Sequence, residues 1–118
     1  MTIQECYEGF GGNYQEVISR LRTDERVAKF LQKVVADGSY KLLCDSLETG
    51  NADEAFRAAH TLKGVCMNLS ITRLAESASA LTEALRERRV LGAELAPLLQ
   101  KVKEDYELTI RCITQLEQ

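Results

Sequence analysis

The sequence predicts an all-α protein, an up-and-down antiparallel four-helix bundle with short N-terminal helices. Its 118 residues include one Pro and seven Gly, too few for a turn-rich β-sandwich. Apolar residues recur at helical spacing through four long segments. The connections between these segments are about two to four residues long, which favours antiparallel neighbours.

The length fits a single domain spanning residues 1–118, because domains usually hold roughly 100–200 residues. We expect short N-terminal helices over about residues 2–22 and the bundle over about residues 23–117. Six glycines coincide with pauses in the helical pattern: Gly9, Gly11, Gly12, Gly38, Gly50 and Gly92. Only Gly64 falls inside a strong helical pattern.

The first half of the chain is predicted as two short helices and a longer run. The short helices cover about residues 2–8 and about residues 13–22, and Asn13 caps the second. The run covers about residues 23–48, with Thr23 as its N-cap and acidic residues in its first turn. Its inner stripe comprises Val27, Phe30, Leu31, Val34, Tyr40, Leu43, Cys44 and Leu47. Gly38 either bends or breaks this run.

The second half is predicted as three helices. The first covers about residues 51–69 and is capped by Asn51, and Thr72 caps the next. Glu87, Arg88 and Arg89 close that helix before Gly92. The last helix has Pro97 in its first turn, where a missing N–H is harmless, so residues 92–95 should be irregular. Its inner side comprises Leu95, Leu99, Val102, Tyr106, Ile110 and Ile113.

Charge and cysteine content indicate the class of protein. The net charge is −3, and the basic residues are scattered apart from Arg86, Arg88 and Arg89. This distribution is not typical of a protein that binds nucleic acid. No apolar run is long enough to cross a membrane, and no leader segment is visible. The cysteines lack metal-binding spacing and read as reduced, buried thiols: Cys6, Cys44, Cys66 and Cys112. We therefore expect a soluble cytoplasmic protein that binds no metal, membrane or nucleic acid.

The helix over residues 51–69 carries the only histidine of the chain, His60. On a helical wheel its apolar face comprises Ala55, Ala58, Ala59, Leu62, Val65, Cys66 and Leu69. His60 falls about 160° from the centre of that face, at about 100° per residue. The imidazole is therefore predicted to point outward.

The residues around His60 are unusual in combination. A mid-helix Gly costs roughly 1 kcal/mol relative to Ala, so Gly64, one turn after His60, suggests close approach of a partner to the backbone. Lys63 and Arg57 flank His60 and could hold an anion there. Phe56 and Met67 add apolar area typical of a docking patch.

This arrangement suits phosphoryl transfer through histidine. A neutral imidazole nitrogen is a good nucleophile near neutral pH, and nearby cations offset the charge of the phosphoryl group. Each residue also has an ordinary interpretation: a surface His, Lys or Arg usually has no special role, and Phe56 and Met67 also fit the side walls of a core. The Thr61 hydroxyl is expected to bond back to a helix carbonyl. The coincidence of His60 with Gly64 favours a functional site.

The segment from Ala58 to Gly64, Ala-Ala-His-Thr-Leu-Lys-Gly, closely resembles the signature of histidine-containing phosphotransfer (HPt) domains. The resemblance continues through Asn68-Leu69 and into Arg73-Leu74-Ala75. These domains are intermediate carriers in multistep two-component phosphorelays. The chain departs from the usual pattern at Ser70, where the family commonly has Gly.

The resemblance implies that His60 is the phosphoacceptor, that Lys63 steadies the phosphoryl group, and that Gly64 leaves room for the partner. Arg57 is not part of the signature and is added from the wheel alone. The implied partners are a response-regulator receiver domain, a hybrid sensor histidine kinase, or both. The receiver would supply the aspartate and Mg²⁺, so we expect a phosphocarrier without cofactor or nucleotide site rather than an enzyme. An exposed acceptor favours a monomer that docks transiently.

Two other classes of function fit parts of the sequence. One is a helical docking or scaffold module, including a decoy that binds receivers without chemistry, which would use Phe56, His60 and Met67. The other is a ferritin-like metal enzyme, which needs Glu-x-x-His motifs on two helices. A single His with Arg57 three residues before it nearly excludes the latter.

Overall fold

The computed structural model describes residues 1–86 and 91–116. Those residues form seven α-helices and one short 3₁₀ helix, and they contain no strand, so the all-α prediction is confirmed. The elements are α1 (Ile3–Phe10), α2 (Tyr14–Leu21), α3 (Asp24–Ala36), α4 (Ser39–Thr49), α5 (Ala52–Asn68), α6 (Thr72–Leu85), η1 (Ala93–Leu95) and α7 (Ala96–Leu116). The basic helix end expected at residues 87–89 and the bundle end at residue 117 lie outside the described residues.

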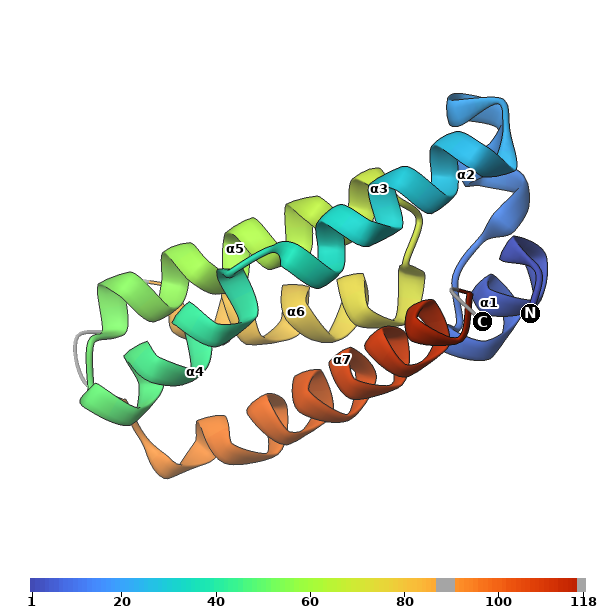
Figure 1. Ribbon diagram of the computed structural model, residues 1–118. Coiled ribbons are helices and arrows are strands. Elements are labelled where there is room, and N and C mark those ends of the chain that lie inside the picture. The colour runs from blue at the N-terminus through green and yellow to red at the C-terminus, as the bar shows by residue number, and fades with distance from the viewer. Residues whose placement is uncertain (87–90, 117–118) are drawn as a thin grey trace.

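The helices form a bundle in which successive long segments alternate in direction (Figure 1). Figure 1 shows α3 and α4 following each other along the long axis, α5 returning beside them, and α6 and α7 reversing in turn. α5 packs against α4 and α6, and α6 packs against α7. Stacked rings of Tyr40 and Tyr106, 3.8 Å between centroids, join α4 to α7. α5 therefore lies between two neighbours along most of its length.

Apolar side chains from every α-helix form one buried cluster. The predicted stripe of α3 is largely correct, since Val27, Leu31 and Val34 are buried. Phe30 is the exception, because its side chain is 38% exposed rather than part of the core. It lies at the border between α3 and α5, where it lines a groove instead of filling the interior.

Gly38 breaks the long run into α3 and α4. Asp37 is extended, with φ −70° and ψ 132°, and the Asp37 carboxylate accepts a hydrogen bond from the Ser39 N–H at 2.9 Å. Gly38 itself has φ −87°, which any residue can adopt. The break therefore comes from the extended backbone of Asp37 and its side-chain hydrogen bond, and not from a left-handed glycine.

Two other details differ from the sequence prediction. Gly9 lies inside α1 rather than at a pause, and a Cβ on it would lie 2.9 Å from the Cys112 sulfur of α7. The missing side chain thus lets α1 and α7 approach closely. Thr72 is the first residue of α6 and not its cap: Ile71 holds the cap position, without a side-chain hydrogen bond.

The N-terminal helices brace the turn between α5 and α6. The buried Tyr7 hydroxyl of α1 donates to the Leu69 carbonyl at 2.7 Å. Two backbone hydrogen bonds lie next to it, from the Asn13 N–H to the Ser70 carbonyl and from the Arg73 N–H to the Gly11 carbonyl. These bonds satisfy polar backbone groups that the end of a helix leaves open. The short helices thus fix the direction in which α6 leaves α5.

Ser70 occupies this turn in a left-handed conformation, with φ 54°. Glycine adopts that conformation without steric cost, which explains why a Gly suits this position in the pattern. In this chain the Ser70 hydroxyl instead bonds to the Glu16 carboxylate and accepts from the Arg20 guanidinium. Contacts with α2 therefore offset the strain of a non-glycine residue.

α7 buries more polar groups than its apolar stripe predicts. Asp105 and Thr109 are buried, and the exposed Lys101 ammonium contacts one Asp105 oxygen at 2.8 Å. The other oxygen, Oδ2, has no hydrogen-bond partner among the described residues. The Thr109 hydroxyl donates to the carbonyl of Asp105. A buried carboxylate is not foreseen by a rule that assigns apolar residues to the core.

The thiols are unpaired, as predicted. Cys6, Cys66 and Cys112 are buried and Cys44 is half-buried. Burial raises the pKa of Cys6 and of Cys66 to about 12, so neither is a thiolate near neutral pH. In the described part of the chain no helix is long and apolar enough to cross a membrane. The same residues contain no cluster of His, Cys, Asp or Glu suited to a metal ion.

Substitutions at Ser70 test the balance between strain and hydrogen bonding. Ser70→Ala loses the bonds to α2 and keeps the strain, whereas Ser70→Gly loses the bonds but relieves the strain. We expect Ser70→Gly to be more stable than Ser70→Ala by about 1 kcal/mol, measured by urea unfolding. Equal stability of the two variants would show that φ at this position relaxes without cost.

Candidate functional site

The cap and the buried face of α5 largely match the sequence prediction. Asn51 caps the helix, since its side chain accepts from the Glu54 N–H at 3.1 Å, and acidic residues in the first turn suit the positive end of the helix dipole. The predicted inner residues Ala55, Ala58, Ala59, Leu62, Cys66 and Leu69 are buried. Val65 is half-buried because it faces the groove between α3 and α5.

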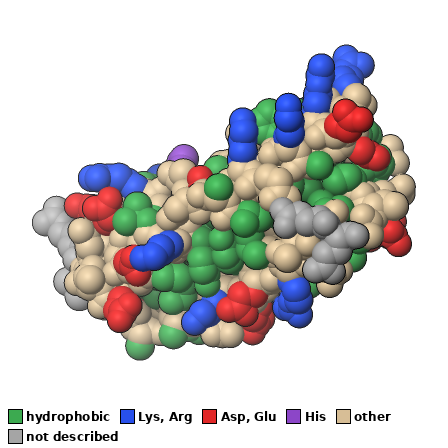
Figure 2. All heavy atoms as spheres, viewed as in Figure 1, with side chains coloured by type: hydrophobic (Ala, Val, Ile, Leu, Met, Phe, Trp, Pro, Cys, Tyr) green, Lys and Arg blue, Asp and Glu red, His purple; other side chains and the backbone are tan. Residues whose placement is uncertain are grey.

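His60 is exposed on the outer side of α5, as the wheel predicts. The single His side chain projects from one edge of the molecule in Figure 2. The ring of Phe56, one turn earlier, approaches the imidazole edge to face, with centroids 6.0 Å apart. Within the described part of the chain, the imidazole makes no hydrogen bond or ion pair, so both ring nitrogens are available to a reactant.

Gly64 lies one turn after His60 and leaves the helix surface bare. A Cβ built at this position meets nothing within 4 Å. The glycine is therefore not required by packing inside the protein, in contrast to Gly9. Open space over the backbone beside an exposed imidazole is the geometry that an incoming loop of a partner needs.

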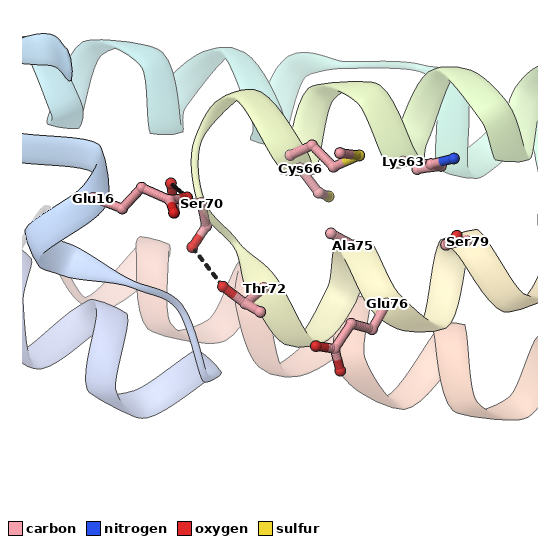
Figure 3. A pocket seen from close by; sticks show the side chains of 9 residues that line it. Glu16, Lys63, Cys66, Ser70, Thr72, Ala75, Glu76 and Ser79 are labelled. Atoms are coloured by element: carbon pink, nitrogen blue, oxygen red, sulfur yellow. Dashed lines mark hydrogen bonds between the residues drawn. The ribbon is translucent and has the colours of Figure 1, made fainter.

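Lys63 lies on the flank of α5 that faces α6. It is half-buried and lines a hollow of about 430 Å³. Lys63 and Ser79 lie toward one end of this hollow, and Glu16 and Ser70 toward the other (Figure 3). The ammonium group is thus held on the same helix as His60, one residue before Gly64, at the edge of a cavity.

The remaining predicted residues surround His60 unequally. Phe56 is half-buried beside the imidazole, and Met67 is 54% exposed farther along the same side of the helix. Arg57 is exposed, at a wheel position on the opposite flank from Lys63. The Thr61 hydroxyl donates to the Arg57 carbonyl at 2.9 Å, which confirms the local bond expected of it.

Two residues at the end of α6, Glu83 and the C-cap Arg86, lie beside the site, which the sequence does not predict. The Arg86 guanidinium lies 5.2 Å from the centroid of the Phe56 ring. Two hydrogen bonds of 3.1 and 2.9 Å tie Arg86 to Glu83. The hydrogen bonds and charge of Arg86 lower the pKa of the Glu83 carboxyl, and the charge of Lys63 lowers it further. Glu83 thus lies close enough to Lys63 of α5 to be affected by its charge, which depends on how α6 packs against α5.

The fold and the site together define a helical bundle that presents one exposed histidine from a central helix. The Hpt domain family matches residues 25–118 of the chain. The chain therefore belongs to the Hpt domain family, whose members serve histidine phosphotransfer in phosphorelays and interact with receiver domains and kinases. Searches of curated proteins and of solved structures found no match. The matched region begins within α3, so α1 and α2 precede it.

Replacement of Gly64 by Ala tests whether the glycine is kept at the expense of stability. Because a Cβ meets no atom, Gly64→Ala should raise the free energy of unfolding by about 1 kcal/mol, measured by urea denaturation. Ala80→Gly at an exposed position of α6 is the matched control and should lower it by a similar amount. A loss of stability in Gly64→Ala would mean that the helix interior, and not a partner, requires glycine.

Proposed function

We propose that the chain carries a phosphoryl group on His60 in a two-component phosphorelay. It would pass the group between the aspartates of receiver domains, or from a sensor kinase to a receiver domain. Exposure of His60 beside the bare helix surface at Gly64 is the observation that supports this function most directly. A phosphoryl donor must approach the ring nitrogen in line, which a buried histidine forbids. Both features lie within the residues that the family matches.

The transfer needs only an accessible nitrogen lone pair on this chain. The outer ring nitrogen of neutral His60 forms a bond to phosphorus while the bond from phosphorus to the aspartyl oxygen of the receiver breaks. The electron pair of the broken bond stays on the departing carboxylate. The other ring nitrogen keeps its proton throughout, so the step requires no general base on this protein.

Neighbouring residues then have distinct roles in the proposed step. The ammonium group of Lys63 offsets the negative charge that the phosphoryl group brings to His60. Phe56, Arg57 and Met67 contribute contact area and charge to the docked partner. The receiver supplies Mg²⁺ along with its aspartate, so in this role the chain is a carrier and not a catalyst.

Replacement of His60 by Gln should abolish labelling. A receiver domain carrying ³²P-phosphate is mixed with the chain in Mg²⁺, and label on each protein is followed by gel. Wild type should take up label, and His60→Gln, which keeps a polar side chain of related size, should take up none. Label persisting in His60→Gln would contradict the assignment, and receiver binding by the wild type without any transfer would select a docking module instead.

Replacement of Gly64 by Leu should block transfer by steric exclusion. The side chain would fill the space over the helix that a partner loop requires, while the bundle tolerates it because nothing lies within 4 Å of the Cβ position. We expect transfer from the receiver to fall at least about a hundredfold, with the circular dichroism spectrum unchanged. Labelling of His60 by phosphoramidate, a small donor that needs no docking, should persist, and unchanged transfer from the receiver would contradict the role of Gly64.

A further inference from the structure

A row of basic side chains follows α3 on the surface of the molecule. Arg26, Lys29 and Lys33 lie three and four residues apart, so they share one face of the helix, and all are exposed. Figure 2 shows Lys and Arg side chains standing in a row along α3, on the edge of the molecule from which the His also projects. Among residues 1–86 and 91–116, none of the three forms an ion pair.

This basic row borders an apolar groove between α3 and α5. The groove has a volume of about 300 Å³. It is lined by Leu21, Phe30, Lys33, Val34, Asp37, Val65, Asn68 and Leu69. Phe30 lies on its α3 side with its ring 38% exposed, and the Lys33 ammonium lies 4.8 Å from the ring centroid. The groove is thus apolar and open to solvent, and its lining includes one cation, Lys33, and one carboxylate, Asp37, while Arg26 and Lys29 lie outside the lining.

The groove begins at the end of the row of α5 residues that includes His60. His60, Gly64 and Asn68 follow one another at intervals of four residues, and each step turns the position by about 40° toward one flank of the helix. Asn68, at the end of this row, lines the groove. A body seated over His60 and Gly64 therefore reaches Phe30 and Lys33 without crossing another helix.

The charge of the basic row beside the groove is opposite to that of the whole chain. The chain carries a net charge of −3, yet three exposed cations follow one another along α3. Such a local field attracts an acidic surface and speeds its association. A nucleic acid fits less well, because three cations beside an apolar floor give a short phosphate track and the net charge opposes it.

We propose that the α3–α5 groove, with the basic row Arg26, Lys29 and Lys33, docks an acidic surface of the receiver domain that exchanges phosphate with His60. An apolar side chain of that receiver packs against Phe30, and its carboxylates face the three cations. This inference rests on the proposed function and adds two details to it. The docking surface of the receiver is acidic, and residues of α3 select that surface.

Charge reversal tests the docking surface with the full chain. The variant is the double substitution Lys29→Glu and Lys33→Glu. The matched control is the double substitution Lys103→Glu and Arg111→Glu, which changes the net charge of the protein by the same amount. Both positions are exposed on α7, which lies on the opposite side of the bundle from α5 (Figure 1). The donor is whichever ³²P-labelled receiver from the same cell labels the wild type in Mg²⁺.

At low salt, kcat/KM for transfer should fall at least about tenfold in the α3 variant and less than about twofold in the control. The difference should shrink in 0.5 M NaCl, because salt screens the attraction. Phe30→Ala should slow transfer at both salt concentrations alike, since it removes an apolar contact. Labelling of His60 by phosphoramidate should be equal in all variants, which confirms that each is folded and that its acceptor is intact.

The two proposals fail in different ways. If the wild-type protein takes up no label from any receiver domain of the same cell, the proposed function is wrong, and the docking proposal falls with it. Transfer that proceeds in wild type and equally fast in the α3 variant and the control overturns the docking surface alone. Binding to duplex DNA that the α3 reversal abolishes, with transfer from the receiver unchanged, would assign the basic row to nucleic acid and likewise overturn the docking proposal.

Discussion

Close packing along the alanine-rich face of α5 is the constraint on which the rest of the structure depends. Ala55, Ala58 and Ala59 are buried where α5 meets its neighbours, and their small side chains let α4 and α6 approach on both sides. The opposite face of the helix remains uncovered, and His60 and Gly64 lie on it. A bulkier inner face would push the flanking helices away and remove the walls that hold Phe56 and Lys63 beside the imidazole.

Local patterns predicted the elements well, because caps and helical periodicity depend on residues close in sequence. Asn13, Thr23 and Asn51 each cap the helix that follows, as expected, and the orientation of His60 follows from the same periodicity. The sequence alone did not predict which residues of different helices lie side by side. Nothing local indicates that Glu83 and Arg86 face α5, or that Phe30 borders a groove instead of entering the core. The basic row Arg26, Lys29 and Lys33 follows from spacing within one helix, but its position beside the groove does not.

The turn between α5 and α6 connects the site to the part of the chain that precedes the family match. Ser70 holds a left-handed backbone there, and its hydroxyl bonds to side chains of α2. Tyr7 closes the same turn from α1 through its hydroxyl. The helix pair before residue 24 therefore compensates for a residue that departs from the usual glycine. This explains in physical terms how the departure is tolerated without disturbing the helix that carries His60.

The presence of a single histidine has a practical consequence for observing this molecule. In the untagged chain the two carbon-bound protons of one imidazole give the only histidine signals in a proton NMR spectrum. Because the ring is exposed and makes no internal hydrogen bond among the described residues, those signals respond to solution conditions and to whatever occupies the ring nitrogens. The protein thus contains an intrinsic spectroscopic reporter at its candidate site, which requires no label, no dye and no assignment of the remaining residues.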